Sequence, residues 1–384
     1  MGLSRRKLFG ALACCAILSA CGAPAGNEQA KTPASAATPL PDYYPASYAT
    51  TIEASKSERG LLIYSNVAEY NWRDILAGFR ARYPWIKVET LDMGPSEVFE
   101  RYYSETAAKR NSADLIVSGA PDAWQRFVSR DGVTEYRSPE TEHLPNWTIP
   151  LPGVYTFSTD PMILVYNKVL LKPEEHPKGV GDLVALGARD PGRFRGKLTT
   201  YDASSHPFAY AIHWSVIADQ KPGGWDFYSK LAPMTRPETG GATMLDKVTA
   251  GEYLAAYYTS AITVFPHMGE RGRDKIVGWT LPADGTPVMI RGLAITKATK
   301  SPASSRLMLD YLVSHDGELA AARGGMTPYR EDIELDEVPY LTFAEVTRRV
   351  GGPSNVVLIG YRKEMLGGYR PFIERWNALF KVKS

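Results

Sequence analysis

The pattern of apolar and polar positions is clearest between residues 60 and 91, where its period changes twice. Leu61 to Tyr64 is a short apolar run that predicts a buried strand, and the polar pair Ser65-Asn66 ends it. Apolar residues then recur at helical spacing until Pro84, and Ile86 to Leu91 alternates like a second strand. A strand, a helix and a strand in this order predict a right-handed crossover in a parallel sheet.

A second strand with a polar pair at its end lies between residues 113 and 119. Its apolar core is followed by Ser118-Gly119, and a helix is predicted from Pro121 to Val128. In open α/β sheets ligands bind beyond the carboxyl ends of the strands. We therefore expect Ser65, Asn66, Ser118 and Gly119 to lie at a ligand-binding cleft. Strand-to-helix turns also favour these residue types for local reasons, which is the alternative interpretation.

The rest of the chain continues to alternate between apolar runs and amphipathic stretches. Strands are predicted at residues 162–166, 197–201 and 253–258, with an extended segment at 287–295, and helices at 97–110, 208–217, 223–231, 242–250, 343–350 and 371–380, with a further helix beginning at Pro302. This alternation is typical of an α/β fold. Because 384 residues exceed the size at which one core keeps growing, we expect two domains.

The N-terminus has the features of an export signal. Three basic residues precede the apolar run from Leu8 to Ala20, and the order Leu18-Ser19-Ala20-Cys21 resembles a bacterial lipobox, whose cysteine is acylated and becomes the mature N-terminus. We expect a signal peptide at residues 1–21 and a flexible tether at 22–57, which is rich in Ala, Pro, Ser and Thr. Three tyrosines interrupt the tether and are candidates for packing on the body: Tyr43, Tyr44 and Tyr48. The choice between the Tat and Sec export routes stays open, and an uncleaved anchor helix is the alternative to cleavage.

Charge and cysteine content exclude several classes of function. Without the three basic residues of the signal, 41 basic residues stand against 42 acidic ones, so nothing indicates a nucleic-acid partner. All three cysteines lie within the first 21 residues, which leaves the body without a disulfide, a thiol nucleophile or a cysteine metal site. No metal site or cofactor is predicted, because the histidines form no metal-binding pair. The sequence also lacks a nucleophile elbow, an HExxH motif and a P-loop, so we do not expect an enzyme.

Two predicted helix starts have the composition of anion sites. Ser204, Ser205 and His206 precede the helix that begins at Pro207, and Thr239-Gly240 precedes another. Free N–H groups and the helix dipole favour phosphate, phosphonate or carboxylate at such a position. The alternative is that these residues only cap their own helices.

Further candidate ligand-binding residues lie at one strand end and in one extended segment. Tyr258, Thr259 and Ser260 end the strand predicted at 253–258. Arg291 lies in the extended segment, where its guanidinium can hold an oxyanion through two hydrogen bonds or pair with a neighbouring acid.

Several segments resemble, in the same order, one family of transport proteins. They are YSN followed by a helix and RYPWIKVE, SADLIVSG, MILVYNKVLL, KLTTYDASSHPFAYA, GWDFYSKLAPM, TAGEY, the segment from DGTPVMIRGLAITKATK to GELAAARGG, and NVVLIGY. These segments are similar to those of extracellular solute-binding proteins of ABC importers, in the type II periplasmic group that binds ferric iron, sugar phosphates or phosphonates.

The resemblance implies two α/β lobes, each a mixed, mostly parallel sheet flanked by helices, that close over a solute about a hinge. The expected lobes are residues 58–157 with 288–330, and residues 158–287, with a C-terminal helical region at 331–384. It further implies a monomeric, lipid-anchored protein outside the cytoplasmic membrane that captures a small anionic solute, such as a phosphonate or a phosphorylated or carboxylated compound. The implied partners are a membrane permease and its ATPase. An extracytoplasmic sensor or hydrolase is a second alternative.

Ferric iron is the first alternative solute. Iron-binding members of the family carry two adjacent tyrosines downstream of a Gly-Glu pair, and this chain has Gly251-Glu252 followed by Tyr257-Tyr258. The alignment, however, puts the iron dyad at Ala261-Ile262. Neighbouring strand residues point to opposite faces, so Tyr257 and Tyr258 cannot both ligate one ion without a bulge.

Overall fold

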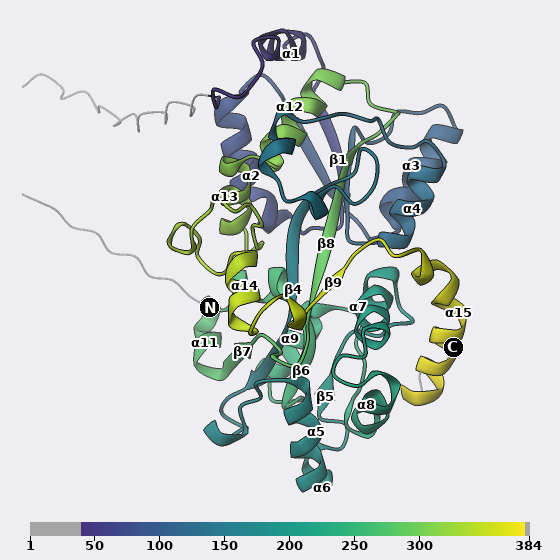
Figure 1. The fold of residues 1–384 in the computed structure, drawn as a ribbon, viewed down its shortest axis with the longest axis vertical. Coiled ribbons are helices and arrows are strands. Elements are labelled where there is room, and N and C mark those ends of the chain that lie inside the picture. The colour runs from purple at the N-terminus through teal and green to yellow at the C-terminus, as the bar shows by residue number, and fades with distance from the viewer. Residues whose placement is uncertain (1–39, 381–384) are drawn as a thin grey trace, which may run out of the picture. The chain divides into compact units, whose positions relative to one another are not determined.

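A computed structural model describes residues 40–380, and within them it contains a mixed sheet surrounded by helices (Figure 1). The strands are β1 Leu61–Ser65, β2 Val88–Asp92, β3 Leu115–Ser118, β4 Tyr155–Asn167, β5 Leu198–Thr199, β6 Ala255–Ser260, β7 Val277–Thr280, β8 Thr286–Ile295 and β9 Val356–Ile359. The helices are α1 Tyr48–Ser55, α2 Glu69–Arg82, α3 Glu97–Ala107, α4 Pro121–Ser129, α5 Val180–Arg189, α6 Pro191–Phe194, α7 Pro207–Ala218, α8 Gly224–Leu231, α9 Gly241–Thr249, α10 Ala261–Val264, α11 Arg273–Ile276, α12 Pro302–Leu312, α13 His315–Arg323, α14 Phe343–Arg349 and α15 Lys363–Phe380. The predicted α/β class is confirmed.

The strand order is β2-β1-β3-β8-β4-β6-β5, with β7 paired to β4 and β9 paired to β8. The predicted crossover is present, because β1 is parallel to β2, with Leu61 opposite Val88, and also to β3. The two long strands β4 and β8 run antiparallel to one another and connect the two parts of the sheet. We call β1 to β3 with their helices the first half and β5 to β7 with theirs the second half.

The predicted lobe boundaries at 157/158 and 287/288 fall inside these two long strands. Strand β4 begins at Tyr155, earlier than the predicted 162, because it continues through Asp160 and Pro161 while paired to β8. The exact division into lobes stays a prediction.

Three groups of buried apolar side chains form the core. In the first half, one lies between the sheet and α2, α12 and α13, and another lies between the sheet and α3 and α4, on opposite sides of β1 in Figure 1. The third and largest fills the second half and extends to α15, where Trp376 is fully buried. Each half therefore buries apolar surface of its own, as expected for a sheet covered by helices.

Some elements are absent from the sequence-based prediction because contacts distant in sequence form them. Helix α5 contains two glycines, which weaken its propensity, but the carboxylate of Asp284 accepts hydrogen bonds from the N–H groups of Val180 and Gly181 and so caps its start. Strand β7 forms by pairing with β4, and β9, in the region predicted to be helical, forms by pairing with β8.

The C-terminal helix begins earlier than predicted. Helix α15 starts at Lys363 and contains Pro371, which was predicted to begin it. A proline inside a helix removes one backbone hydrogen bond. Tertiary contacts stabilise the part of the helix before Pro371, because Met365 is buried and its carbonyl accepts a hydrogen bond from the Tyr210 hydroxyl at 2.6 Å.

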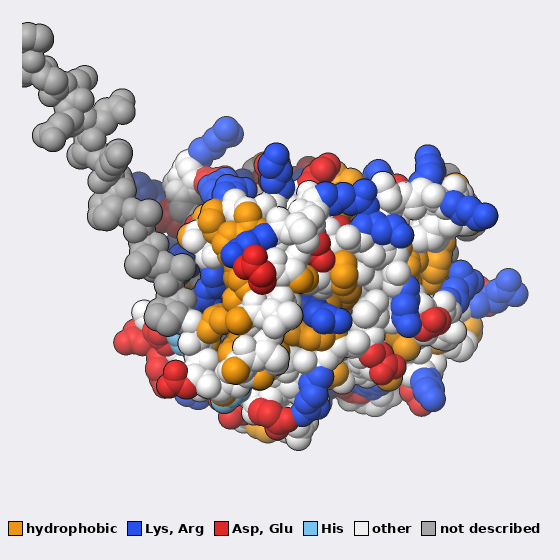
Figure 2. Space-filling view, turned by 90° about the horizontal axis from the view of Figure 1, so that it is seen from above, with side chains coloured by type: hydrophobic (Ala, Val, Ile, Leu, Met, Phe, Trp, Pro, Cys, Tyr) orange, Lys and Arg blue, Asp and Glu red, His pale blue; other side chains and the backbone are white. Residues whose placement is uncertain are grey.

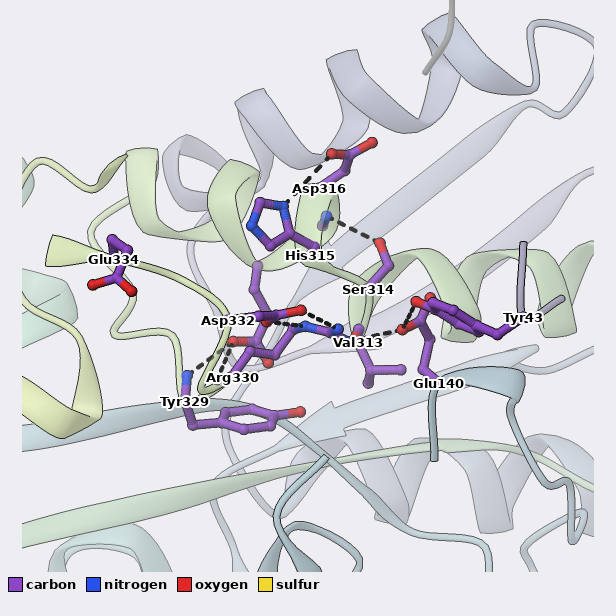
Figure 3. A network of polar contacts seen from close by, with 12 residues as sticks. Tyr43, Glu140, Val313, Ser314, His315, Asp316, Tyr329, Arg330, Asp332 and Glu334 are labelled. Atoms are coloured by element: carbon purple, nitrogen blue, oxygen red, sulfur yellow. Dashed lines mark hydrogen bonds and ion pairs between the residues drawn. The ribbon is translucent and has the colours of Figure 1, made fainter. Parts of the chain in front are cut away.

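The described part of the predicted tether is not free chain. Residues 48–55 form α1, and all three tyrosines of the segment contact the body. Tyr43 and Tyr44 donate hydrogen bonds to the buried carboxylate of Glu140 at 2.8 and 2.6 Å, and Tyr48 donates to Asp310 at 2.8 Å. Figure 3 shows that Glu140 also pairs with Arg330, at 2.7 Å. The tether prediction is corrected for residues 40–57, because these hydrogen bonds hold the segment on the body.

The remaining N-terminal predictions lie outside the described residues. These are the signal peptide at 1–21, lipidation at Cys21 and the tether at 22–39. Between residues 40 and 380, none of the helices combines the length and the apolar character needed to cross a membrane. Figure 2 shows one face of the molecule, on which basic and acidic side chains are interspersed with exposed apolar ones.

Candidate functional site

A cleft with a volume of about 230 Å³ lies at the carboxyl ends of β1, β2 and β6. The lining comes from the turns and strand ends of both halves. It consists of Asn66, Val67, Ala68, Tyr70 and Asn71 after β1, Asp92 at the end of β2 with Met93 and Pro95 after it, Tyr201, His206 and Phe208 before and within α7, Thr239 and Gly240 before α9, Ser260 at the end of β6 with Ile262 and Thr263 after it, and Arg291 on β8. Both halves of the molecule therefore contribute to one cavity, at the position where α/β sheets hold ligands.

The structure brings some of the predicted site residues to this cleft and leaves others outside it. The lining includes Asn66, His206, Thr239, Gly240, Ser260 and Arg291. It does not include Ser65, Ser118, Gly119, Ser204, Ser205, Tyr258 or Thr259.

The first-half residues outside the lining support the loops that form it. The Ser65 hydroxyl oxygen accepts hydrogen bonds from the Val67 N–H at 3.0 Å and the Trp72 indole at 3.2 Å. The Ser118 hydroxyl donates to the Pro95 carbonyl at 2.6 Å, and the Gly119 N–H donates to the Asn66 side-chain oxygen at 3.2 Å. Ser65 therefore has the local role that the sequence left open, whereas Ser118 and Gly119 join the end of β3 to the loops after β2 and β1.

The two serines before α7 are occupied within their own loop. Ser204 donates to the Asp202 carboxylate through its N–H and its hydroxyl, and the Ser205 hydroxyl donates to the Asp202 carbonyl at 2.6 Å. The indole of Trp376 on α15 donates to the same carboxylate at 3.1 Å. Neither serine lines the cleft or caps α7, whose cap is His206, so both hydroxyls bond within their own loop.

His206 lines the cleft and is the residue that caps α7. Its Nδ1 accepts a hydrogen bond from the Ala209 N–H at 3.2 Å, so its protonated Nε2 donates to the Thr239 carbonyl at 3.1 Å. Burial lowers the pKa of His206, which favours this neutral tautomer. Both ring nitrogens are therefore in use, and neither is available to coordinate a metal.

The tyrosine pair at the end of β6 lies in the core of the second half. Tyr257 and Tyr258 are both fully buried, and neither lines the cleft. A bulge is present here, because two residues of β6, Tyr257 and Tyr258, stand opposite the single residue Leu164 of β4, and Tyr258 has a φ of +60°. The bulge nevertheless leaves both rings among apolar neighbours, away from the cleft.

No group of three or more His, Cys, Asp or Glu side chains within residues 40–380 is arranged to hold a metal ion. Two phenols, Tyr70 and Tyr201, do line the cleft. Burial raises the pKa of both hydroxyls, which opposes phenolate formation.

Arg291 lines the cleft and belongs to a buried ion pair that sequence analysis predicted only in part. Arg291 Nη2 lies 2.9 Å from an Asp160 carboxylate oxygen, and the two side chains are 3% and 0% exposed. Asp160 was not singled out, although an acid beside a strongly apolar strand indicates a buried counter-ion. Burial raises the pKa of Asp160, and the Arg291 charge opposes this shift. Asp160 thus balances the charge of the predicted oxyanion-binding arginine.

What remains available to a solute is a set of backbone N–H groups and hydroxyls. Helices α2 and α9 both begin at the cleft, and no side chain caps either of them. Their first N–H groups have no intrahelical acceptor, and the helix dipoles add partial positive charge there. Asp92, the other ionised lining residue besides Arg291, is exposed at the rim.

Comparison with known proteins finds solved structures that share this fold. The structure resembles the crystal structure of the substrate-binding protein of an ABC transporter from Agrobacterium tumefaciens, with a TM-score of 0.74 and 21% identity over 84% of this chain and 96% of that one. It also resembles iron-bound HitA from Pseudomonas aeruginosa, with a TM-score of 0.62 and 20% identity over 81% of this chain and 98% of that one.

A third similar structure is the periplasmic binding protein AfuA from Actinobacillus pleuropneumoniae with fructose-6-phosphate bound, with a TM-score of 0.60 and 17% identity over 84% of this chain and 99% of that one. These likenesses show the fold, and the expected two-lobed type II periplasmic binding fold is confirmed. No curated protein sequence matches the chain. The model of the family of bacterial extracellular solute-binding proteins matches residues 74–340, and the chain therefore belongs to that family.

Proposed function

We propose that this protein is the lipid-anchored solute-binding component of an ABC importer and that its cleft captures a small anionic solute. A phosphonate, or a phosphorylated or carboxylated organic compound, is the expected ligand. The family membership and the similar ABC-transporter protein from Agrobacterium tumefaciens support the transport role. AfuA, whose structure contains fructose-6-phosphate, supports the class of solute. Delivery to a permease and its ATPase follows from the transport role.

The observation that carries the proposal is the meeting of helix starts at one cleft. The uncapped starts of α2 and α9 face the cavity from the two halves, and the start of α7 lies beside them. Because Asp160 balances Arg291, peptide N–H groups rather than a free cation would meet the negative charge of the solute. Closure of the two halves over the solute would exclude water from these hydrogen bonds.

Ferric iron is the second candidate, and one observation favours it. The phenols of Tyr70 and Tyr201 both line the cleft, and Fe³⁺ prefers hard oxygen ligands. HitA was crystallised with iron bound. The raised pKa values of the two phenols weigh against this candidate. Nothing in the described residues favours a sensor or a hydrolase.

A thermal-stability screen tests the proposal. The probes are fructose-6-phosphate, methylphosphonate, 2-phosphoglycerate, citrate and ferric nitrilotriacetate. A ligand at 100 times its dissociation constant stabilises the native state by about 2.7 kcal/mol. Stabilisation by at least one anionic organic probe, without turnover, is the expected result. Stabilisation by the ferric probe alone would favour iron, and no stabilisation by any anionic probe would refute the anion proposal.

Two matched threonine and serine variants locate the site. Thr239 lines the cleft before α9, whereas Ser205 lies outside it in the α7 loop. Thr239→Ala should weaken the stabilising probe by about 1–3 kcal/mol, because a hydrogen bond to a charged ligand is lost. Ser205→Ala, the control, should leave the affinity unchanged. Isothermal titration calorimetry measures both, and the reverse ranking would move the site to the α7 loop.

The lipid anchor is tested by cysteine replacement in the exporting host. Cys21→Ser should abolish incorporation of labelled palmitate and release the protein into the soluble fraction. Cys14→Ser and Cys15→Ser are the controls, because these residues lie within the apolar part of the predicted signal. Unchanged labelling of the Cys21 variant would contradict lipidation at this residue.

A further inference from the structure

Asp160 and Arg291 stand on the two strands that connect the halves. Asp160 is on β4 opposite Met289, and Arg291 is on β8 opposite Ser158. They are therefore diagonal neighbours on one face of an antiparallel pair, close enough for their side chains to meet. Both are buried, and Asp160 does not line the cleft.

The second-half side of this pair is held by the turn after β6. The Ser260 hydroxyl donates a hydrogen bond to one Asp160 carboxylate oxygen at 2.6 Å, and the Ile262 N–H donates to the other at 3.3 Å. Both Ser260 and Ile262 line the cleft. The Arg291 guanidinium also lies 5.6 Å from the centroid of the Phe208 ring, another lining residue.

The first-half side of the pair is held by the turns after β1 and β3. Arg291 Nη1 donates to the Asn66 side-chain oxygen at 2.9 Å, and the Gly119 N–H donates to the same oxygen at 3.2 Å. A continuous set of hydrogen bonds thus joins the turns of the two halves, running from Gly119 through Asn66, Arg291 and Asp160 to Ser260.

We propose that the Asp160–Arg291 pair is a clasp that fixes the cleft-lining turns of the two halves in one arrangement, and that Asp160 is a positioning residue for solute binding. This proposal rests on the proposed function in one respect, because it takes the cleft to be the solute-binding site. Its role is to hold Asn66 and Ser260 at a fixed separation, without contact between Asp160 and the solute. The alternative is that Arg291 is a solute counter-ion that Asp160 restrains.

The primary test needs no solute. Spin labels are attached at Glu100→Cys on α3 and Ala242→Cys on α9, both exposed, in a chain whose three native cysteines are replaced by serine. Pulsed electron resonance then measures the distance distribution between the halves. The Asp160→Asn variant keeps the oxygen that accepts from Ser260 but loses the charge, and it should broaden or shift the distribution relative to the parent. An unchanged distribution would overturn the clasp.

A second buried ion pair controls for general destabilisation. Glu140 and Arg330 lie 2.7 Å apart and are 0% and 1% exposed, and neither lines the cleft. Glu140→Gln should lower the thermal midpoint without changing the distance distribution. Should it broaden the distribution as much as Asp160→Asn does, the effect is not specific to the clasp and the proposal fails. If the single variant does not fold, the Asp160→Asn/Arg291→Gln double variant, which removes both charges, replaces it in the distance measurement.

A binding measurement distinguishes the clasp from the counter-ion alternative, because the two predict opposite changes in the affinity of the Asp160→Asn variant for the probe. Inorganic phosphate and fructose-6-phosphate are the probes. If the pair positions the cleft, Asp160→Asn weakens the probe that binds by tenfold or more. If Arg291 is a restrained counter-ion, the same variant frees a cation and binds that probe more tightly, which would overturn the proposal. The distance measurement does not require that either probe binds. The clasp can therefore fail while the anion proposal holds, and the anion proposal can fail while the clasp holds.

Discussion

Glu318 carries the sharpest prediction for stability. It lies on α13 and is 1% exposed. One carboxylate oxygen accepts hydrogen bonds from the N–H groups of Tyr329 at 2.8 Å and Arg330 at 3.2 Å, but the other has no partner among the described residues. Burial raises the pKa of Glu318 to about 8, although these amides and the Arg330 charge act in the opposite direction.

The sign of the effect follows from proton linkage. The unfolded chain releases the Glu318 proton near pH 4.5, whereas the folded chain holds it until about pH 8. The unfolded state therefore binds fewer protons between these values, and the stability contributed by this group is lost as the pH rises through that window. A difference of roughly 3.5 pKa units sets an upper limit of about 5 kcal/mol, and we expect about 2–4 kcal/mol because the site relaxes when it ionises.

Glu318→Gln removes this titration. The amide oxygen can still accept from Tyr329 and Arg330, while the buried NH₂ group costs about 1–3 kcal/mol at every pH. The free energy of unfolding of the variant minus that of the wild type should therefore rise by about 2–4 kcal/mol between pH 5 and pH 8.5. Urea denaturation followed by tryptophan fluorescence measures this difference.

An exposed residue provides the matched control for Glu318. Glu331→Gln, in the loop after Arg330, removes an exposed carboxylate and is measured in the same way. If the Glu318→Gln difference does not change with pH, Glu318 titrates alike in the folded and unfolded chain and the reasoning about its burial is wrong.

Three further predictions concern packing and caps, and each is read from urea midpoints. Tyr48→Phe should destabilise the protein by about 1–3 kcal/mol, because it removes a hydrogen bond to the buried Asp310 carboxylate, and an unchanged midpoint would mean that the N-terminal segment contributes nothing. Asp284→Ala should cost about 1–2 kcal/mol through the lost cap of α5, and full retention of stability would show that solvent replaces it. Gly292→Ala should cost about 1–3 kcal/mol, since its Cβ would collide with Trp124 and Tyr361. Gly367→Ala, in open space on α15, is the control and should be neutral or stabilising. Equal effects of the two substitutions would contradict the packing argument.

The sequence was sufficient for the elements whose periodicity is local. The crossover from β1 through α2 to β2 and the helices α3, α4 and α7 begin and end within a few residues of their predicted bounds. Elements that depend on distant partners could not be found this way. Helix α5 needs Asp284, and β7 and β9 each exist only by pairing with a long strand.

Prediction of the site had the same limitation. Strand ends and helix starts directed attention to turns that line the cleft, because Asn66, Thr239 and Ser260 are among its lining residues. Local patterns cannot tell a hydroxyl that faces a cleft from one that bonds to its own loop, as Ser204 and Ser205 do. Nor can they show that Arg291 already has a counter-ion, because Asp160 is 131 residues away in the chain.

The docked N-terminal segment bears on how the protein should be produced. A recombinant chain designed from hydropathy alone would begin at Glu58, directly after the predicted tether at 22–57. Such a chain would lack the phenols that reach Glu140 and Asp310, and it would expose the apolar surface of α12 on which α1 lies. A reagent intended for ligand screening should therefore begin before Leu40. An apparent lack of solute affinity in a shorter version would reflect damaged folding rather than the wrong choice of compound.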